Sequence, residues 1–404
     1  MNPARDLPAS TPPAPAGERR WPDALIILGG TGVLAGLWLD ARHAAFAWLL
    51  AFLFYLSLSL GALFLVLMHH LFDAAWSAPL RRVCEHLAAL VFPWLALAFL
   101  PVAAFASHIF GGNLRGGSSA PTLAAPAWLA ASAFCFVAWW WLTRRLRFWS
   151  LEQDRTGAVE CVRRLRTCSG AGIVMLAITL TLAAVLWLER LTPQWVSTVV
   201  PLGFFAGSVW VAVAAVYLIA LALRRNGVLA PVLSARQFYF LGIVLFAFTI
   251  LHAYFEFSQY LIIWNANLPA ETFWFGLREQ GTWFAAGLIL VFGHFLVPFL
   301  ALMRMDLKLR AGWMAPLCVW IGLMHWLDLA FWVQPVIAPA GWPWQWAWLD
   351  AACLALLGGI LAKAFRKDLA AHAPFPVNDP RLAEALAETE ETIGGLAANP
   401  DNPE

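Results

Sequence analysis

Charged residues are scarce in this chain, and their scarcity excludes an ordinary soluble domain. Asp, Glu, Lys and Arg make up 12% of the 404 residues, whereas 61% of the residues are hydrophobic. Soluble globular proteins carry about 25% charged residues. The formal net charge is only +2, so the composition also gives no support to a nucleic-acid partner. The composition therefore predicts a protein embedded in lipid.

Cysteine motifs are lacking as well. The chain has six cysteines, but no two of them follow C-x-x-C spacing, and there is no C-x-x-C-H motif for covalent haem. Iron–sulfur clusters need clustered thiolates. We therefore expect structural cysteines, no metal site and no cofactor bound by this chain alone.

What the chain does have is long apolar runs. A helix that crosses a bilayer needs about 20 mostly apolar residues. The runs predict an all-α integral membrane protein with about ten transmembrane helices, at 21–39, 43–71, 87–110, 126–143, 168–188, 195–223, 237–264, 281–303, 313–333 and 343–364. This transmembrane domain (21–364) follows a Pro- and Ala-rich tail at 1–20, predicted to be disordered. A polar, acidic tail at 365–404 follows it.

The basic residues predict the orientation of these spans. Of the 26 Lys and Arg residues, 22 fall on the side that holds both termini. Lys and Arg are enriched in cytoplasmic loops, so both termini are predicted to be cytoplasmic. The longest cytoplasmic connection, 144–167, alternates basic and apolar residues and predicts one or two amphipathic helices at the membrane surface. Three prolines inside spans, Pro93, Pro101 and Pro298, predict bent helices.

The seventh span carries ionisable residues on one face. His252, Glu256 and Gln259 follow i, i+4, i+7 spacing, which places them on the same side of a helix. A charged group at the bilayer centre costs at least about 2.5–3.5 kcal/mol. This face must therefore meet a polar partner or water.

Further ionisable residues fall within or next to other spans. They are His69, His70 and Asp73 at the inner end of the second span, His294 in the eighth, His325 and Asp328 in the ninth, and Asp350 in the tenth. One interpretation is a proton path, with an inner entrance at the second span and a middle and outer part formed by the others together with His252, Glu256 and Gln259. A second is haem b ligation by two facing histidines among His252, His294 and His325. A third is a set of buried polar pairs that fix helix packing, each worth about 1 kcal/mol or less.

Four stretches of the chain resemble a known family. They are HHLFDAAWSAPLRRVCE at 69–85, EFSQYLIIWNANLPAETFWF at 256–275, REQGTW at 278–283 and FGHFLVPF at 292–299. They resemble the ActF membrane subunits of the bacterial alternative complex III, which is similar to quinol-oxidising assemblies built on NrfD, or polysulfide-reductase-type, membrane subunits. The resemblance covers about 43–310, and SQYLIIWNANLP is its most specific piece. Eight residues are carried over as candidates: His69, Asp73, Arg81, Glu85, Glu256, Gln259, Arg278 and His294.

The resemblance implies a fold, partners and a location. Spans two to five and six to nine would form two four-helix bundles with flanking helices, in the bacterial inner membrane. The complex would oxidise a quinol and pass electrons through an Fe–S protein to cytochrome c or an oxidase. The partners would be lipids, the Fe–S protein, an NrfD-like sister subunit and cytochrome c subunits. The Fe–S clusters and haem c would be carried by the partner subunits, and quinone would be a ligand of the complex.

Three functions follow as hypotheses. The leading one is an integral membrane subunit of a quinol:cytochrome c (or oxidase) oxidoreductase complex, which acts as a scaffold and offers a transmembrane proton route. The first alternative is a quinol-binding, NrfD-like catalytic subunit, whose acceptor of electrons would lie in another chain. The second alternative is a stand-alone secondary transporter.

Overall fold

The computed structural model describes residues 20–111 and 125–387 of the chain. It is 86% helical, and the described residues form no β-strand. Ten helical segments within these ranges are long and apolar enough to cross a membrane. The predicted all-α, multi-pass membrane fold is therefore confirmed. The prediction of disorder at 1–20 concerns residues that, apart from Arg20, lie outside the described ranges.

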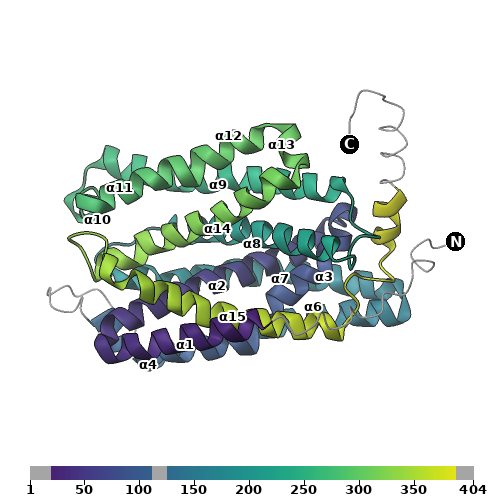
Figure 1. Ribbon diagram of the computed structural model, residues 1–404, viewed down its shortest axis with the longest axis horizontal. Helices are drawn as coiled ribbons and strands as arrows, with labels where there is room; N and C mark the ends of the chain where they lie inside the picture. Colours follow the sequence, from purple (N-terminus) through teal and green to yellow (C-terminus); the bar gives the residue numbers. More distant parts are fainter. Residues whose placement is uncertain (1–19, 112–124, 388–404) are drawn as a thin grey trace.

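The helices run back and forth along the long axis of the molecule (Figure 1). The α-helices are α1 (Trp21–Leu39), α2 (Ala41–Leu71), α3 (Arg81–Ala89), α4 (Ala96–Ala104), α5 (Ala106–Phe110), α6 (Ala125–Thr156), α7 (Val159–Trp187), α8 (Val200–Arg225), α9 (Ala235–Ala266), α10 (Pro269–Gly276), α11 (Gly281–Ile289), α12 (Val297–Met303), α13 (Met305–Leu309), α14 (Ala311–Val333) and α15 (Ala347–Ala371). Shorter 3₁₀ or π segments are η2 (Ala75–Leu80), η3 (Val91–Leu95), η5 (Glu189–Leu191), η6 (Leu290–Leu296), η7 (Gln334–Val336) and η8 (Trp344–Trp346).

The spans assemble into two bundles and a flanking pair. One bundle holds α2, the α3–α5 span, α6 and α7, and the other holds α8, α9, the α11–α12 span and α14. Helices α1 and α15 pack along each other beside the first bundle (Figure 1). Helices α2 and α8 join the two bundles, and Gly61 of α2 lies directly against the backbone of Ser208. This is the arrangement implied by the resemblance.

The connection at 144–167 is helical, but it forms no separate surface helix. Helix α6 continues to Thr156 and α7 begins at Val159. Between them the chain turns at Gly157, whose φ of +65° suits glycine. The extension is stabilised because Ser150 and Gln153 are buried against other helices, while Arg144, Arg145 and Arg155 stay exposed.

Prolines interrupt two spans. Phe92, just before Pro93, has extended backbone angles (φ −140°, ψ 133°) inside η3, where the third span bends. In the eighth span the π segment η6 lies immediately before Pro298, which stands in the first turn of α12. A π segment contains one extra residue per turn and rotates the side chains that follow. His294 lies in this segment, so its direction depends on the interruption.

The chain folds back after the last span. Helix α15 extends beyond residue 364, the predicted end of the span, to Ala371. Residues 372–387, which we call the C-terminal segment, then return to the end of the bundles where α2 ends and α3 begins. Asp379 and Arg381 of this segment are buried. The first part of the acidic tail is thus docked on the transmembrane domain.

Candidate functional site within the membrane

Three spans bring their ionisable residues together. His252 and Glu256 come from α9, His294 from η6, and His325 and Asp328 from α14. The three histidines are buried, and the two carboxylates are half-buried. We call these five residues the intramembrane cluster. It unites most of the residues that the sequence predicts for the middle and outer part of a proton path.

Two of the three imidazoles of the cluster, those of His252 and His294, form a stack with a tryptophan. The rings of His252 and His294 are stacked with centroids 4.3 Å apart, and Trp210 of α8 stacks on the other side of His294 at 4.0 Å. His252 Nε2 lies 3.4 Å from Asp328 Oδ2. The stacking holds the two rings in position, and the carboxylate of Asp328 compensates a positive charge on His252.

His325 is connected to the first bundle. Its Nε2 lies 2.8 Å from the hydroxyl of Ser57, which is buried in α2. Its other ring nitrogen, Nδ1, is buried without a hydrogen-bond partner. The Nε2 atom of His294 is likewise buried and unpartnered. Buried polar atoms are almost always hydrogen-bonded, so these nitrogens point to exchangeable protons or water in the site.

Two glycines of α8 make room for the cluster. A Cβ atom at Gly203 would lie 2.6 Å from Glu256 Oε1, and one at Gly207 would lie 3.0 Å from His325 Cε1. Gly203 stands in the first turn of α8.

A small cavity lies in the middle of these groups. Its polar lining consists of Glu256, His325 and Asp328, and its remaining wall is apolar or glycine: Leu188, Val200, Gly203, Phe204, Leu329 and Trp332. The cavity has room for about one water molecule. Such a space allows proton transfer between the carboxylates and imidazole, but a quinone ring does not fit into it.

The ligand geometry suits a metal ion poorly. Ligand atoms of His252, His294 and Asp328 lie within 4.8 Å of one another. Ligand atoms around a tetrahedral zinc ion lie about 3.4 Å apart, since each is about 2.0–2.1 Å from the metal. The rings of His252 and His294 are stacked face to face with centroids 4.3 Å apart, so these two histidines do not bind opposite sides of one haem iron through their nitrogens. The expectation that the chain binds no metal stays a prediction.

The residues predicted as an inner entrance belong to a different cluster. His69 lies 12 residues after Ser57 in α2, which is about 18 Å along a helix. His69 Nε2 lies 3.7 Å from Asp379 of the C-terminal segment, and His70 Nδ1 lies 3.4 Å from Arg381. Asp73 is exposed and pairs with Arg166 at 3.0 Å. These contacts describe a fixed polar junction at the end of the bundles.

Buried arginines complete this junction. Arg81 forms an ion pair with Asp379, and Arg82 pairs with Glu85 at 2.6 Å. The hydroxyl of Ser150 in α6 donates to the other oxygen of Glu85, also at 2.6 Å. Of these residues, Arg81 and Glu85 were identified through the resemblance. The participation of Asp379 had no local sequence signal, because 298 or more residues separate it from its partners Arg81 and His69.

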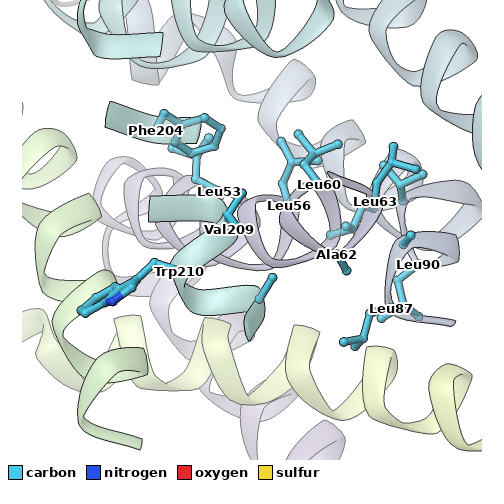
Figure 2. Close-up of a cluster of buried hydrophobic side chains, with 14 of the residues drawn as sticks. Leu53, Leu56, Leu60, Ala62, Leu63, Leu87, Leu90, Phe204, Val209 and Trp210 are labelled. Carbon is cyan, nitrogen blue, oxygen red and sulfur yellow. The ribbon is translucent and has the colours of Figure 1, made fainter. Parts of the chain in front are cut away.

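An apolar layer separates the two clusters. Leu60, Leu63 and Leu67 of α2 lie between Ser57 and His69 and are fully buried. Figure 2 shows Leu60 and Leu63 within a larger group of apolar side chains that includes Leu87 and Leu90. Along α2, buried apolar side chains therefore separate the predicted inner entrance from the intramembrane cluster, and no ionisable residue of this helix joins them.

Three other predicted residues lie outside the intramembrane cluster. Asp350 is buried and accepts a hydrogen bond of 3.0 Å from Gln334, and it does not line the cavity. Gln259 is buried near Glu256 on α9, with Oε1 unpartnered. Arg278 donates to the backbone carbonyls of Trp274, Phe331 and Trp332, so it ties the loop after α10 to the end of α14.

Sequence reasoning missed the residues that enclose the cluster. They are Ser57, Gly203, Gly207 and Trp210. The spacing Gly203-x-x-x-Gly207 was a usable signal, because small residues four apart mark close helix contacts in membranes. Ser57 and Trp210 stand in long apolar runs with no local sign of a polar partner.

The fold and this site define a multi-pass helical membrane protein with a buried cluster of imidazoles and carboxylates. No family model matches the chain, and no curated protein matches it either.

Proposed function

We propose that the chain is an integral membrane subunit of a bacterial inner-membrane complex that oxidises quinol and reduces cytochrome c or an oxidase, and that its intramembrane cluster exchanges protons. The observation that carries the proton role is the meeting of Glu256, His325 and Asp328 around one small cavity at the first turn of α8. The assignment to a complex is supported by the resemblance of the stretches within 43–310 to ActF subunits.

The cluster has the groups that proton exchange requires. Imidazole exchanges protons near neutral pH, and a donor must reach its acceptor directly or through one water molecule. Glu256 and Asp328 line the same cavity, and His252 lies 3.4 Å from Asp328. A proton on Glu256 can thus pass through the cavity to Asp328 or His325, while His252 and His294 adjust the charge of the cluster.

The separation of the two polar clusters limits where exchange takes place. The apolar layer on α2 lies between the cluster and the junction with the C-terminal segment. We therefore assign proton exchange to the half of the membrane opposite the C-terminal segment. In this scheme the polar junction serves assembly and stability, and the redox chemistry takes place on Fe–S and haem groups of partner subunits.

The quinol-binding alternative has less support. A quinol hydroxyl needs a base within hydrogen-bond reach, and the intramembrane cluster could supply it. Its cavity, however, has room for about one water molecule. A quinol site would have to lie elsewhere, at the boundary with another subunit.

The experiment uses the full-length tagged chain purified from its native membranes. We expect Fe–S and cytochrome c subunits to copurify with it. Purification as a stable monomer would contradict the assignment to a complex and favour a stand-alone transporter.

After reconstitution of the complex in liposomes, Glu256→Gln should abolish proton movement coupled to quinol oxidation while electron transfer continues. Glu279→Gln is the matched control, because Glu279 is exposed. Unchanged coupling in a fully assembled Glu256→Gln complex would exclude Glu256 from the route.

A further inference from the structure

Glu189 is a buried carboxylate that has no role in the site described above. It lies in η5, directly after α7, and only 5% of its surface is exposed. The backbone N–H of Ser197 donates to its carboxylate, whereas Oε1 is buried without a hydrogen-bond partner. A buried carboxylate with an unpartnered oxygen needs a proton or a water molecule there.

Glu189 does not itself line the cavity of the intramembrane cluster, but residues next to it along the chain do. Its chain neighbour Leu188 lines that cavity, and so does Val200, which lies three residues after Ser197. Gly203, which touches Glu256, lies another three residues on, in the first turn of α8. The backbone between Ser197 and Gly203 spans at most about 15 Å. Glu189 and Glu256 are therefore held at the same end of α8.

Tryptophans close this region on one side. Trp195 stacks on Trp274 with centroids 4.7 Å apart, and Trp274 packs against Trp332 at 4.5 Å. Trp332 itself lines the cavity. On the other side the chain reaches the surface, since Val196, next to Ser197, is 74% exposed. Glu189 thus lies between the enclosed cavity and an exposed loop.

We propose that Glu189 is the relay group that connects the intramembrane cluster to the surface formed by residues 192–199. A proton leaves the carboxylic acid of Glu256, passes through the cavity and then by water past Leu188, and binds the carboxylate of Glu189. Glu256 becomes a carboxylate, and Glu189 then releases the proton at the loop. This inference rests on the proposed function, because it assumes that Glu256 exchanges protons.

The test compares three variants of the purified complex in liposomes: Glu189→Gln, Glu256→Gln and the control Glu160→Gln. Glu160 lies in the first turn of α7, at the opposite end of the same helix, and is exposed. Proton release is followed with a pH-sensitive dye while quinol oxidation is measured in parallel. Glu189→Gln should slow proton release by about 100-fold, the lower end for a general acid–base group, and leave electron transfer through the uncoupled complex unchanged. Glu160→Gln should have no effect.

The outcomes separate the inference from the function on which it rests. Loss of coupling in Glu256→Gln with normal coupling in Glu189→Gln would overturn the relay role and leave the proposed function standing. Normal coupling in both would overturn both. If the glutamine variant does not assemble, Glu189→Asp replaces it in the test. A relay role for residue 189 predicts that this variant releases protons at a reduced rate and that the dependence of this rate on pH is shifted. Full release with an unchanged profile would overturn the relay.

Discussion

At the scale of single residues, the intramembrane cluster depends on two glycines of α8, whose lack of a side chain leaves room for the cluster. Gly203 and Gly207 leave space on α8 that Glu256 and His325 occupy. The sequence predicted that the carboxylate and imidazoles share an interior, because their spacing on α9 and α14 is visible. The sequence did not predict that these side chains would lie against the glycines of α8. Which helix supplies an empty surface depends on how the two bundles meet, and no local pattern contains that information.

Gly203→Ala tests this arrangement. The new methyl group would lie 2.6 Å from Glu256 Oε1, so the carboxylate must move away from α8. Because the far end of a flexible side chain can yield, we expect the free energy of unfolding to change by less than about 1.5 kcal/mol. Proton release by the reconstituted complex should fall strongly, since Glu256 loses its position in the cavity.

Gly322→Ala in α14 is the matched control for this variant. No atom lies within 4 Å of a Cβ placed there, so both the melting temperature in detergent and proton release should stay near those of the natural chain. If Gly203→Ala also releases protons normally, the position of Glu256 against α8 is irrelevant to exchange.

At the scale of elements, the contact between α2 and α8 decides whether the two bundles stay together. A Cβ at Gly61 would collide with the backbone of Ser208 and lie 2.8 Å from the Ala212 Cβ. A carboxylate can change its rotamer to avoid a new methyl group, whereas the backbone of α8 can avoid it only if the whole helix moves. Gly61→Ala should therefore destabilise the protein by about 1–3 kcal/mol, measured as a lower melting temperature in detergent. The Gly322→Ala control again should not change it, and a Gly61→Ala protein of normal stability would show that the helices separate at little cost.

The C-terminal segment is held by a buried carboxylate outside the spans. Burial raises the pKa of Asp379, but the positive charge of Arg81, the contact with His69 and the positive charge of Arg381 outweigh it, so the pKa lies well below its usual range. A depressed pKa means that the folded protein favours the ionised form. The stabilisation is therefore complete above the unfolded pKa near 3.8 and is lost as the pH falls below it.

Asp379→Asn should detach this segment at neutral pH. It leaves the buried Arg81 with Glu85, 3.2 Å away, as its remaining carboxylate partner, and it removes the carboxylate that pairs with Arg381. Removing one partner of a buried ion pair costs up to about 3–5 kcal/mol, so limited proteolysis should then cut between residues 372 and 387. The natural chain should become equally sensitive only in acid. Asp23→Asn is the control, because Asp23 pairs with Lys363 at the surface and such pairs contribute about 1 kcal/mol or less. A protected segment in Asp379→Asn would mean that apolar contacts of Phe375 and Leu382 hold it.

Elements also show where sequence reasoning ends. Apolar length placed the ten spans, and Pro93 and Pro298 indicated where spans three and eight are interrupted. The π segment at 290–296 was not predictable, although it directs His294 toward His252. The tail beyond 364 looked like a solvated acidic segment because its charge is visible and its distant partners are not. Burial of Asp379 depends on Arg81 of α3, which only the folded chain brings near.

At the scale of the whole molecule, the intramembrane cluster lies near the middle of the spans and the polar junction lies where α2 ends. Apolar side chains of α2 lie between them, some of which Figure 2 shows. The even number of described spans returns the end of α15 to the start of α1, where Lys363 lies 2.7 Å from Asp23. Within the described ranges, 20 of the 23 Lys and Arg residues belong to this same end by their place between the spans, and the other three are Arg42, Arg190 and Arg278. A protein with this asymmetry is expected to insert with that end in the cytoplasm.

Single-cysteine accessibility measures this orientation. In a chain whose natural cysteines are replaced by serine, Lys367→Cys should react with a membrane-impermeant maleimide only after the inner membrane is opened. Glu279→Cys, in the exposed loop after α10, should react in intact spheroplasts. Reversed labelling would place the C-terminal segment outside, and with it would reverse the direction in which Glu256 and Glu189 could release protons. The sign of charge movement in the proposed function therefore depends on this one measurement, and it can be made before any partner subunit is known.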